Sequence, residues 1–242
     1  SAEMGDGADL AFGGAGDDTL SGGAGDDRLW GGAGRDTIYA GEGDNVVSSG
    51  AGDDAIFTGA GADSIDAGDD ENHVEAGAGN DTIITGGGRD SIYRGAGDDS
   101  ISSGAWDDAV IAGDGNDTVF GGADEDWIEG GAGDDHLWGG TGRDTMWGGD
   151  GNDIFVIGPG TGEDYIDGGV GWTDTIQLDG VGGITSITGN TISGEGWTAV
   201  IHGDHTIGAQ DASSVMLSAD SSGTIDFDTG ETITFEGIER VT

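Results

Sequence analysis

The chain has 242 residues, of which 56 are glycine, one is proline and none is cysteine. Its 49 acidic and 6 basic residues give a formal net charge of −43 at pH 7, which makes nucleic acid and anionic membranes poor partners. The lack of cysteine excludes disulfides and thiol catalysis, whereas dense carboxylates suit hard divalent cations. No apolar run reaches the length of a membrane-spanning helix, so we expect no membrane span.

The first 156 residues are dominated by a nine-residue repeat, which runs without a gap from Gly13 to Val156 in sixteen blocks. Each block reads Gly, Gly, any, Gly, any, Asp, any, apolar, any, as in GGTGRDTMW at 139–147. A degenerate block, Met4–Phe12, precedes them. The second position is always Gly, the sixth is Asp in fourteen blocks, and the eighth is always apolar. This strict period distinguishes the segment from glycine-rich low-complexity sequence.

Each position of the repeat has a physical reason. Alternating glycines tolerate positive φ, so the first six residues can form a tight turn in which carbonyl groups converge. The last three residues suffice only for a minimal strand, whose middle residue points inward. We therefore expect two blocks to close a coil of eighteen residues, with Asp63, Asp81 and Asp99 as vertical neighbours. Unscreened carboxylates at this spacing would repel one another, and a Ca²⁺ ion between each pair would remove the repulsion.

The repeat resembles the nonapeptide of the repeats-in-toxin (RTX) family of secreted bacterial proteins. The resemblance implies an all-β fold, a right-handed parallel β-roll solenoid with two repeats per coil, whose turns bind Ca²⁺. It also implies that the ligands are the sixth-position Asp and the backbone carbonyls of the preceding turn. Seventeen turns on two flanks leave room for at most about fifteen Ca²⁺ ions. The implied carboxylate ligands are Asp9, Asp18, Asp27, Asp36, Asp54, Asp63, Asp81, Asp90, Asp99, Asp108, Asp117, Asp126, Asp135, Asp144, Asp153 and Asp164. The turn glycines implied to bind through the backbone are Gly14, Gly16, Gly23, Gly25, Gly32, Gly34, Gly77, Gly79, Gly95, Gly97, Gly113, Gly115, Gly131, Gly133, Gly140, Gly142, Gly149 and Gly151.

Some blocks in the middle of the series depart from the pattern. Asn45 and Asn72 replace the sixth-position Asp. The fourth glycine is replaced by Asp70, Trp106 and Asp124. Block 67–75 has both changes, and we expect weaker or missing ions beside it; the alternative is sequence drift with binding retained.

Beyond Val156 the period loosens, although 160–167 and 168–176 are still repeat-like and Asp164 can still serve as a ligand. We expect the roll to occupy 4–176 and a small β cap to occupy 177–242, because solenoids need atypical units to cover their open ends. Alternation of apolar and polar residues predicts strands in the cap, with a hairpin turn at Thr229–Gly230. The predicted strands are Ile184–Ile192, Trp197–His202, Thr224–Phe227 and Thr232–Phe235. The final ten residues, 233–242, resemble the segment before Hint-type autoprocessing modules in some RTX proteins.

Motif searches favour a binding role over catalysis. The sequence contains neither HExxH nor G-x-S-x-G, which argues against a zinc protease and a lipase. The pair His202 and His205 could bind a transition metal, but an ordinary polar turn is the preferred interpretation. Aromatic residues recur at the ninth position, which should face outward, and they either stack on a glycan or pair across coils. They are Trp30, Tyr39, Phe57, Tyr93, Phe120, Trp138 and Trp147.

The leading interpretation is a calcium-binding structural module, not an enzyme. The resemblance implies that it belongs to a larger extracellular protein, is exported unfolded by type I secretion machinery, and folds on binding Ca²⁺. One alternative is an adhesive module that binds a glycan or another cell-surface partner through the aromatic faces. A second alternative is a calcium-dependent enzyme acting on polysaccharides.

Overall fold

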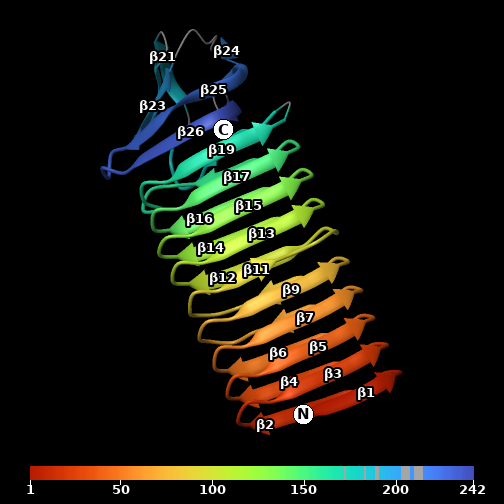
Figure 1. The fold of residues 1–242 in the computed structure, drawn as a ribbon. Helices are drawn as coiled ribbons and strands as arrows, with labels where there is room; N and C mark the ends of the chain where they lie inside the picture. The colour runs from red at the N-terminus through yellow and green to blue at the C-terminus, as the bar shows by residue number, and fades with distance from the viewer. Residues whose placement is uncertain (172, 183, 189–190, 203–207, 210–214) are drawn as a thin grey trace.

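The computed structural model describes residues 1–171, 173–182, 184–188, 191–202, 208–209 and 215–242. In these residues the regular secondary structure consists entirely of β-strands, which stack into a long roll with a second β unit at its C-terminal end (Figure 1). Among the described residues, no helix is long and apolar enough to cross a membrane. The all-β parallel roll predicted from the repeat is confirmed.

The roll consists of two parallel sheets that share the coils. Each strand pairs with the strand two places later, so that Leu20 lies beside Ile38 and Val110 beside Ile128. The predicted coil of eighteen residues is therefore confirmed. The first sheet contains β1 (Ala2–Asp6), β3 (Thr19–Ala24), β5 (Thr37–Glu42), β7 (Ala55–Ala60), β9 (His73–Ala78), β11 (Ser91–Tyr93), β13 (Ala109–Asp114), β15 (Trp127–Ala132), β17 (Thr145–Asp150) and β19 (Tyr165–Val170). The second contains β2 (Leu10–Ala15), β4 (Arg28–Ala33), β6 (Val46–Ala51), β8 (Ser64–Asp66), β10 (Thr82–Ile84), β12 (Ser100–Ala105), β14 (Thr118–Ala123), β16 (His136–Thr141), β18 (Ile154–Ile157) and β20 (Thr175–Leu178).

Most strands of the roll are longer than the predicted three residues. The prediction is correct only for β8, β10 and β11, whereas most of the others have six residues. The extra length arises because the first residues of the next block continue the parallel pairing, as Gly122 does with Gly140. Each six-residue strand therefore points two residues inward, the eighth residue of one block and the first residue of the next.

The two interior positions have different sizes. All sixteen eighth-position residues are at most 2% exposed and form the continuous core. The first position holds only Gly, Ala, Ser or Thr in fifteen blocks, and Arg94 in the remaining one. At Gly22 there is no room even for a methyl group, because a Cβ atom there would lie 2.2 Å from the Asp27 carboxylate and 2.5 Å from the Ala40 carbonyl oxygen. Hydroxyls at this position bond to the next coil, as Thr58 does with the Ala76 carbonyl at 2.7 Å.

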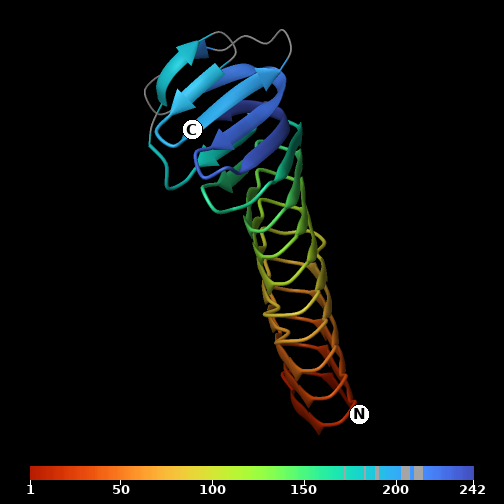
Figure 2. The same cartoon turned by 90° about the vertical axis from the view of Figure 1, so that its left-hand side faces the viewer.

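The C-terminal unit is an antiparallel sheet that covers the last coil (Figure 2). The chain turns between its last two strands near Gly230 (φ +104°), as predicted. The final strand also pairs in parallel with β19, through Ile166 and Phe235, and with β20, through Ile176 and Val241. The predicted boundary between residues 176 and 177 stays a prediction, because the final strand pairs with both sheets of the roll and also with the cap. The cap strands are β21 (Ile184–Thr188), β22 (Thr191–Gly194), β23 (Trp197–His202), β24 (Gly208–Ala209), β25 (Val215–Phe227) and β26 (Thr232–Val241).

Candidate metal centre

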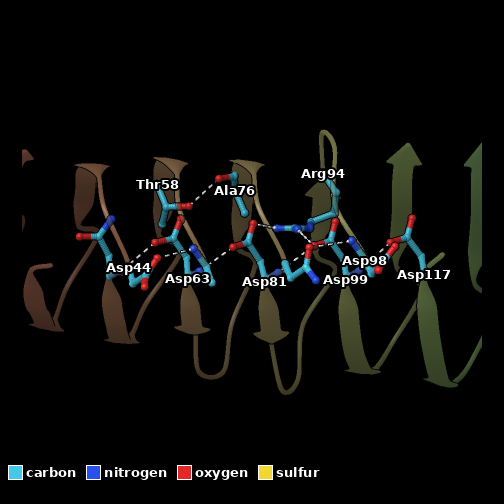
Figure 3. Close-up of polar contacts among 12 residues, drawn as sticks. Asp44, Thr58, Asp63, Ala76, Asp81, Arg94, Asp98, Asp99 and Asp117 are labelled. Atoms are coloured by element: carbon cyan, nitrogen blue, oxygen red, sulfur yellow. Dashed lines mark hydrogen bonds and ion pairs between the residues drawn. The ribbon is translucent and has the colours of Figure 1, made fainter. Parts of the chain in front are cut away.

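The sixth-position Asp residues form two ladders along the flanks of the roll. In each ladder the backbone N–H of one Asp donates to Oδ1 of the Asp one coil later. Asp99 donates to Asp117, and Asp117 donates to Asp135, both at 2.8 Å. Figure 3 shows one such row, in which Asp63, Asp81, Asp99 and Asp117 follow one another along the roll. The predicted vertical stacking of these carboxylates is thus present.

The second carboxylate oxygen of these residues is the unusual feature. Among the described residues, fourteen Asp side chains are between 0% and 3% exposed and have an Oδ2 atom without any hydrogen-bond donor. A buried anionic oxygen without a partner is costly, because its hydration is lost and nothing replaces it. These residues are Asp27, Asp36, Asp54, Asp63, Asp90, Asp99, Asp108, Asp117, Asp126, Asp135, Asp144, Asp153, Asp164 and Asp174.

The same carboxyl groups are hard to ionise without a metal. Burial, reinforced by the neighbouring carboxylates and partly opposed by the donated N–H group, raises the pKa of Asp126 and of Asp135 to about 8. Burial likewise raises the pKa of Asp108 and of Asp164 to about 7. A row of divalent cations would allow these groups to be charged in the interior.

The two Asn-containing turns reveal what surrounds the second oxygen. Asn45 accepts the Asp27 N–H group through Oδ1 at 3.0 Å, as an Asp would, and its Nδ2 donates to the carbonyls of Gly41 and Gly43 at 3.2 and 2.8 Å. Asn72 Nδ2 likewise donates to the Asp70 carbonyl at 3.0 Å. The carbonyls of the second and fourth turn residues therefore point at the second terminal atom of the sixth side chain, which is Nδ2 in Asn and Oδ2 in Asp.

An Asp at this position places an anionic oxygen where Asn places a donor. Carboxylate and carbonyl oxygens then face one another with no hydrogen between them. Oxygen ligands converging in this way are the donor set that Ca²⁺ prefers. The described residues contain no group of three or more His, Asp or Glu side chains that could hold a metal, so backbone carbonyls have to complete each site. The residues present fit the ion.

The structure places the sixteen predicted carboxylates in the two ladders, with Asp9 and Asp18 partly exposed in the first coils and the others buried. The predicted turn glycines lie in the same turns, and all except Gly95 have positive φ. Asp174 completes a ladder through its bond from the Asp153 N–H at 2.9 Å, although it is outside the predicted ligand set. An insertion before Asp174 shifts it out of the sixth position of its block, so the nine-residue spacing does not identify it. The motif His202–His205 falls largely outside the described residues.

A second row of polar residues lies outside the turns, at the fifth position, and sequence analysis missed it. On one flank Asn and Asp alternate from Asn80 to Asn152, and the N–H of Asn116 donates to Asp98 Oδ1 at 2.8 Å. On the other flank an arginine interrupts the acids at every third coil, with Arg35 bonded to Asp53 at 2.6 Å and Arg89 to Asp107 at 2.8 Å. This alternation reduces repulsion between coils at the surface, whereas no such neutral or basic spacer relieves most of the buried rows. A search for periodicity at eighteen residues could have found it.

Together these features define a parallel β-roll solenoid whose turns are built to enclose hard cations. The family profile described as RTX calcium-binding nonapeptide repeat (4 copies) matches residues 5–38, 30–65, 39–74, 66–101, 95–128, 102–137 and 120–155. These segments cover more than half of the chain, which therefore belongs to the RTX calcium-binding repeat family. The comparison with curated proteins gave no match.

Proposed function

We propose that this chain is the calcium-dependent folding module of a larger secreted protein. It stays loose during type I export from a calcium-poor cytosol and folds when it meets extracellular Ca²⁺. The observation that supports this most directly is the set of fourteen buried Asp Oδ2 atoms without a donor. Extracellular calcium modules bind at roughly 10⁻⁴–10⁻³ M, so calcium outside the cell would fill such sites and cytosolic calcium would not.

The roles of the residues follow from the turn geometry. The sixth-position carboxylates and the carbonyls of the second and fourth turn residues would hold Ca²⁺ between successive coils. The ion supplies positive charge that allows buried carboxylates to remain ionised. The eighth-position apolar residues fill the interior, but each block has only one of them. Burial of apolar surface alone therefore compensates for little of the conformational entropy that a long chain loses on folding. The module provides stiffness and a folding trigger and no turnover.

A calcium titration of the whole chain tests this proposal. Calorimetry should show several ions bound per chain, at most about fifteen, and far-UV circular dichroism should show the β signal growing with calcium occupancy. Magnesium at the same concentration is the control, because its smaller shell and reluctance to lose water suit it poorly to these carbonyl-rich sites. Full β structure in excess chelator, with no heat of calcium binding, would contradict the proposal.

Binding of a glycan through the aromatic faces is a second candidate. Tyr39 and Phe120 are 47% and 43% exposed. Their rings, however, already stack on the next coil, with centroid distances of 5.1 Å for Tyr39 and Phe57 and 4.5 Å for Phe120 and Trp138. Because one face of each of these rings is covered in this way, we favour a role in holding coils together. A glycan array probed in calcium with the native chain and with Tyr39→Ala and Trp147→Ala distinguishes the two.

A further inference from the structure

Arg94 is the one large side chain at the inward first position of the sixteen blocks. Its side chain is 0% exposed, although the position elsewhere accepts nothing larger than Thr. Burial of a guanidinium is tolerated only when carboxylates or similar acceptors surround it. The carboxylates around Arg94 therefore identify the negative charge that its guanidinium neutralises.

The guanidinium lies between two rungs of one Asp ladder (Figure 3). Arg94 Nη1 donates to Asp81 Oδ2 at 2.7 Å, and Nη2 contacts Asp99 Oδ1. Among the described residues, Asp81 is the one buried sixth-position Asp that is absent from the set with an unpartnered Oδ2. A side chain of the protein thus supplies here the positive charge that the neighbouring rungs lack.

The backbone of this turn also differs from the others. Gly95, which follows Arg94, is the only second-position glycine of the sixteen blocks without positive φ. The strand before it, β11, ends at Tyr93, whereas its neighbours β9 and β13 continue three residues into the following block; β8 and β10 of the other sheet are equally short. The backbone beside the arginine therefore differs in conformation from the corresponding position of the other fifteen blocks.

We infer that Arg94 permanently replaces one Ca²⁺ ion, so the interval between Asp81 and Asp99 holds no metal and is closed by the guanidinium alone. An arginine stays protonated at any physiological pH, and a divalent cation placed beside it would meet a buried like charge. The ladder that contains Asp81 and Asp99 is then closed at this step by an ion pair of the protein itself, while the other ladder continues past it through Asp90 and Asp108. This inference rests on the proposed calcium function.

The test is the number of calcium ions bound by the full chain and by Arg94→Gly, counted by native mass spectrometry and calorimetry. Gly restores the commonest first residue of the repeat. We expect the variant to bind one ion more than the native chain. Arg89→Gly is the matched control, because Arg89 is 62% exposed, pairs with Asp107 on the outside, and should leave the count unchanged. An equal count in Arg94→Gly and the native chain would overturn the inference.

If Arg94→Gly fails to fold, the native chain alone still decides. Crystals grown in calcium should show anomalous calcium peaks along both ladders and none between Asp81 and Asp99. A peak in that interval would overturn the role of Arg94 while leaving the calcium function intact. An absence of calcium at every turn of the native chain would instead overturn the proposed function, and the inference with it.

Discussion

At the scale of a residue, the sixth position of the repeat combines two tasks. One side-chain oxygen accepts an N–H group from the preceding coil, as Asp135 Oδ1 does from Asp117 and Asn45 Oδ1 does from Asp27, so both Asp and Asn can perform this task. The other atom faces carbonyl oxygens of its own turn. Asn45 satisfies them with its amide, whereas an Asp needs a cation. The choice between these two residues therefore determines whether a turn depends on metal.

We expect Asp135→Asn to fold with fewer bound calcium ions and Asp135→Ala to be clearly less stable. The Asn variant keeps the bond from the Asp117 N–H and can donate to the turn carbonyls as Asn45 does. The Ala variant leaves that buried N–H group without an acceptor, at a cost of about 1–3 kcal/mol. Thermal unfolding in saturating calcium measures the difference. Equal stability of the two variants would show that the side-chain amide takes no part.

Trp106 offers a second test at this scale. It occupies the fourth position of its turn with φ +84°, a conformation that costs a non-glycine residue roughly 1–2 kcal/mol, and its side chain is 59% exposed. Trp106→Gly should therefore raise the free energy of unfolding by about 1 kcal/mol. Chemical denaturation in calcium provides the measurement, with Ala105→Gly as the control for added chain entropy. A loss of stability in Trp106→Gly would indicate that the indole makes contacts that outweigh the backbone strain.

At the scale of the strand, the eighth-position core and the Asp ladders could be predicted because both follow from the period alone. The positions of Asp126 and Ile128 in the block recur every nine residues. The direction of their side chains is therefore fixed once a coil is known to contain eighteen residues. The inward first position was missed because glycine is common there and suggests a turn. Only pairing with the next coil makes it part of a strand. Arg94 follows the same logic, since no local pattern indicates that a charged residue points inward.

The cap could be predicted as β structure, but its attachment could not. The alternating segment at Thr232–Phe235 indicates a strand, and its hairpin partner follows from the turn at Gly230. The parallel pairing of β26 with β19 and β20 joins residues about seventy positions apart in sequence, as Ile166 and Phe235 show. No spacing in the chain encodes that contact, because it arises only after the roll exists.

Deletion of residues 232–242 should therefore destabilise the last coils and not only the cap. The deletion removes Phe235 and Val241, which are 1% exposed, and uncovers Ile166 and Ile176 beneath them. We expect hydrogen exchange to accelerate across β17–β20 while the first coils stay protected. Deletion of the first coil, residues 1–18, is the control for loss of one end. Unchanged protection of β19 in the C-terminal deletion would show that the cap strand is dispensable.

At the scale of the molecule, the buried ladders make stability depend on pH in opposite directions with and without calcium. Burial raises the pKa values of Asp108, Asp126 and Asp135 to about 7, 8 and 8 in the metal-free roll. Below about pH 4 these groups are protonated in the folded and unfolded chain alike and cost no stability. Between about pH 4 and 8 the unfolded chain loses protons first, so the metal-free roll loses stability over that range.

Metal-stripped protein should consequently have more β structure at about pH 4.5 than at pH 8, and saturating calcium should reverse the order because Ca²⁺ binds the ionised carboxylates. Far-UV circular dichroism at both pH values, with and without calcium, provides the measurement. High salt without calcium is the control for general screening of the net charge of −43. A metal-free chain that is more structured at pH 8 would contradict the assignment of the buried Asp rows.

The position of β26 sets an order of events during biosynthesis. This strand closes the open edges of β19 and β20, yet it is made after every other strand of the roll and cap that the structure describes. Until residues 232–241 leave the ribosome, both edges present unpaired N–H and C=O groups to any neighbouring chain. Premature coiling would therefore expose nascent copies to edge-to-edge association, and a low-calcium interior that postpones coiling would shield them throughout translation.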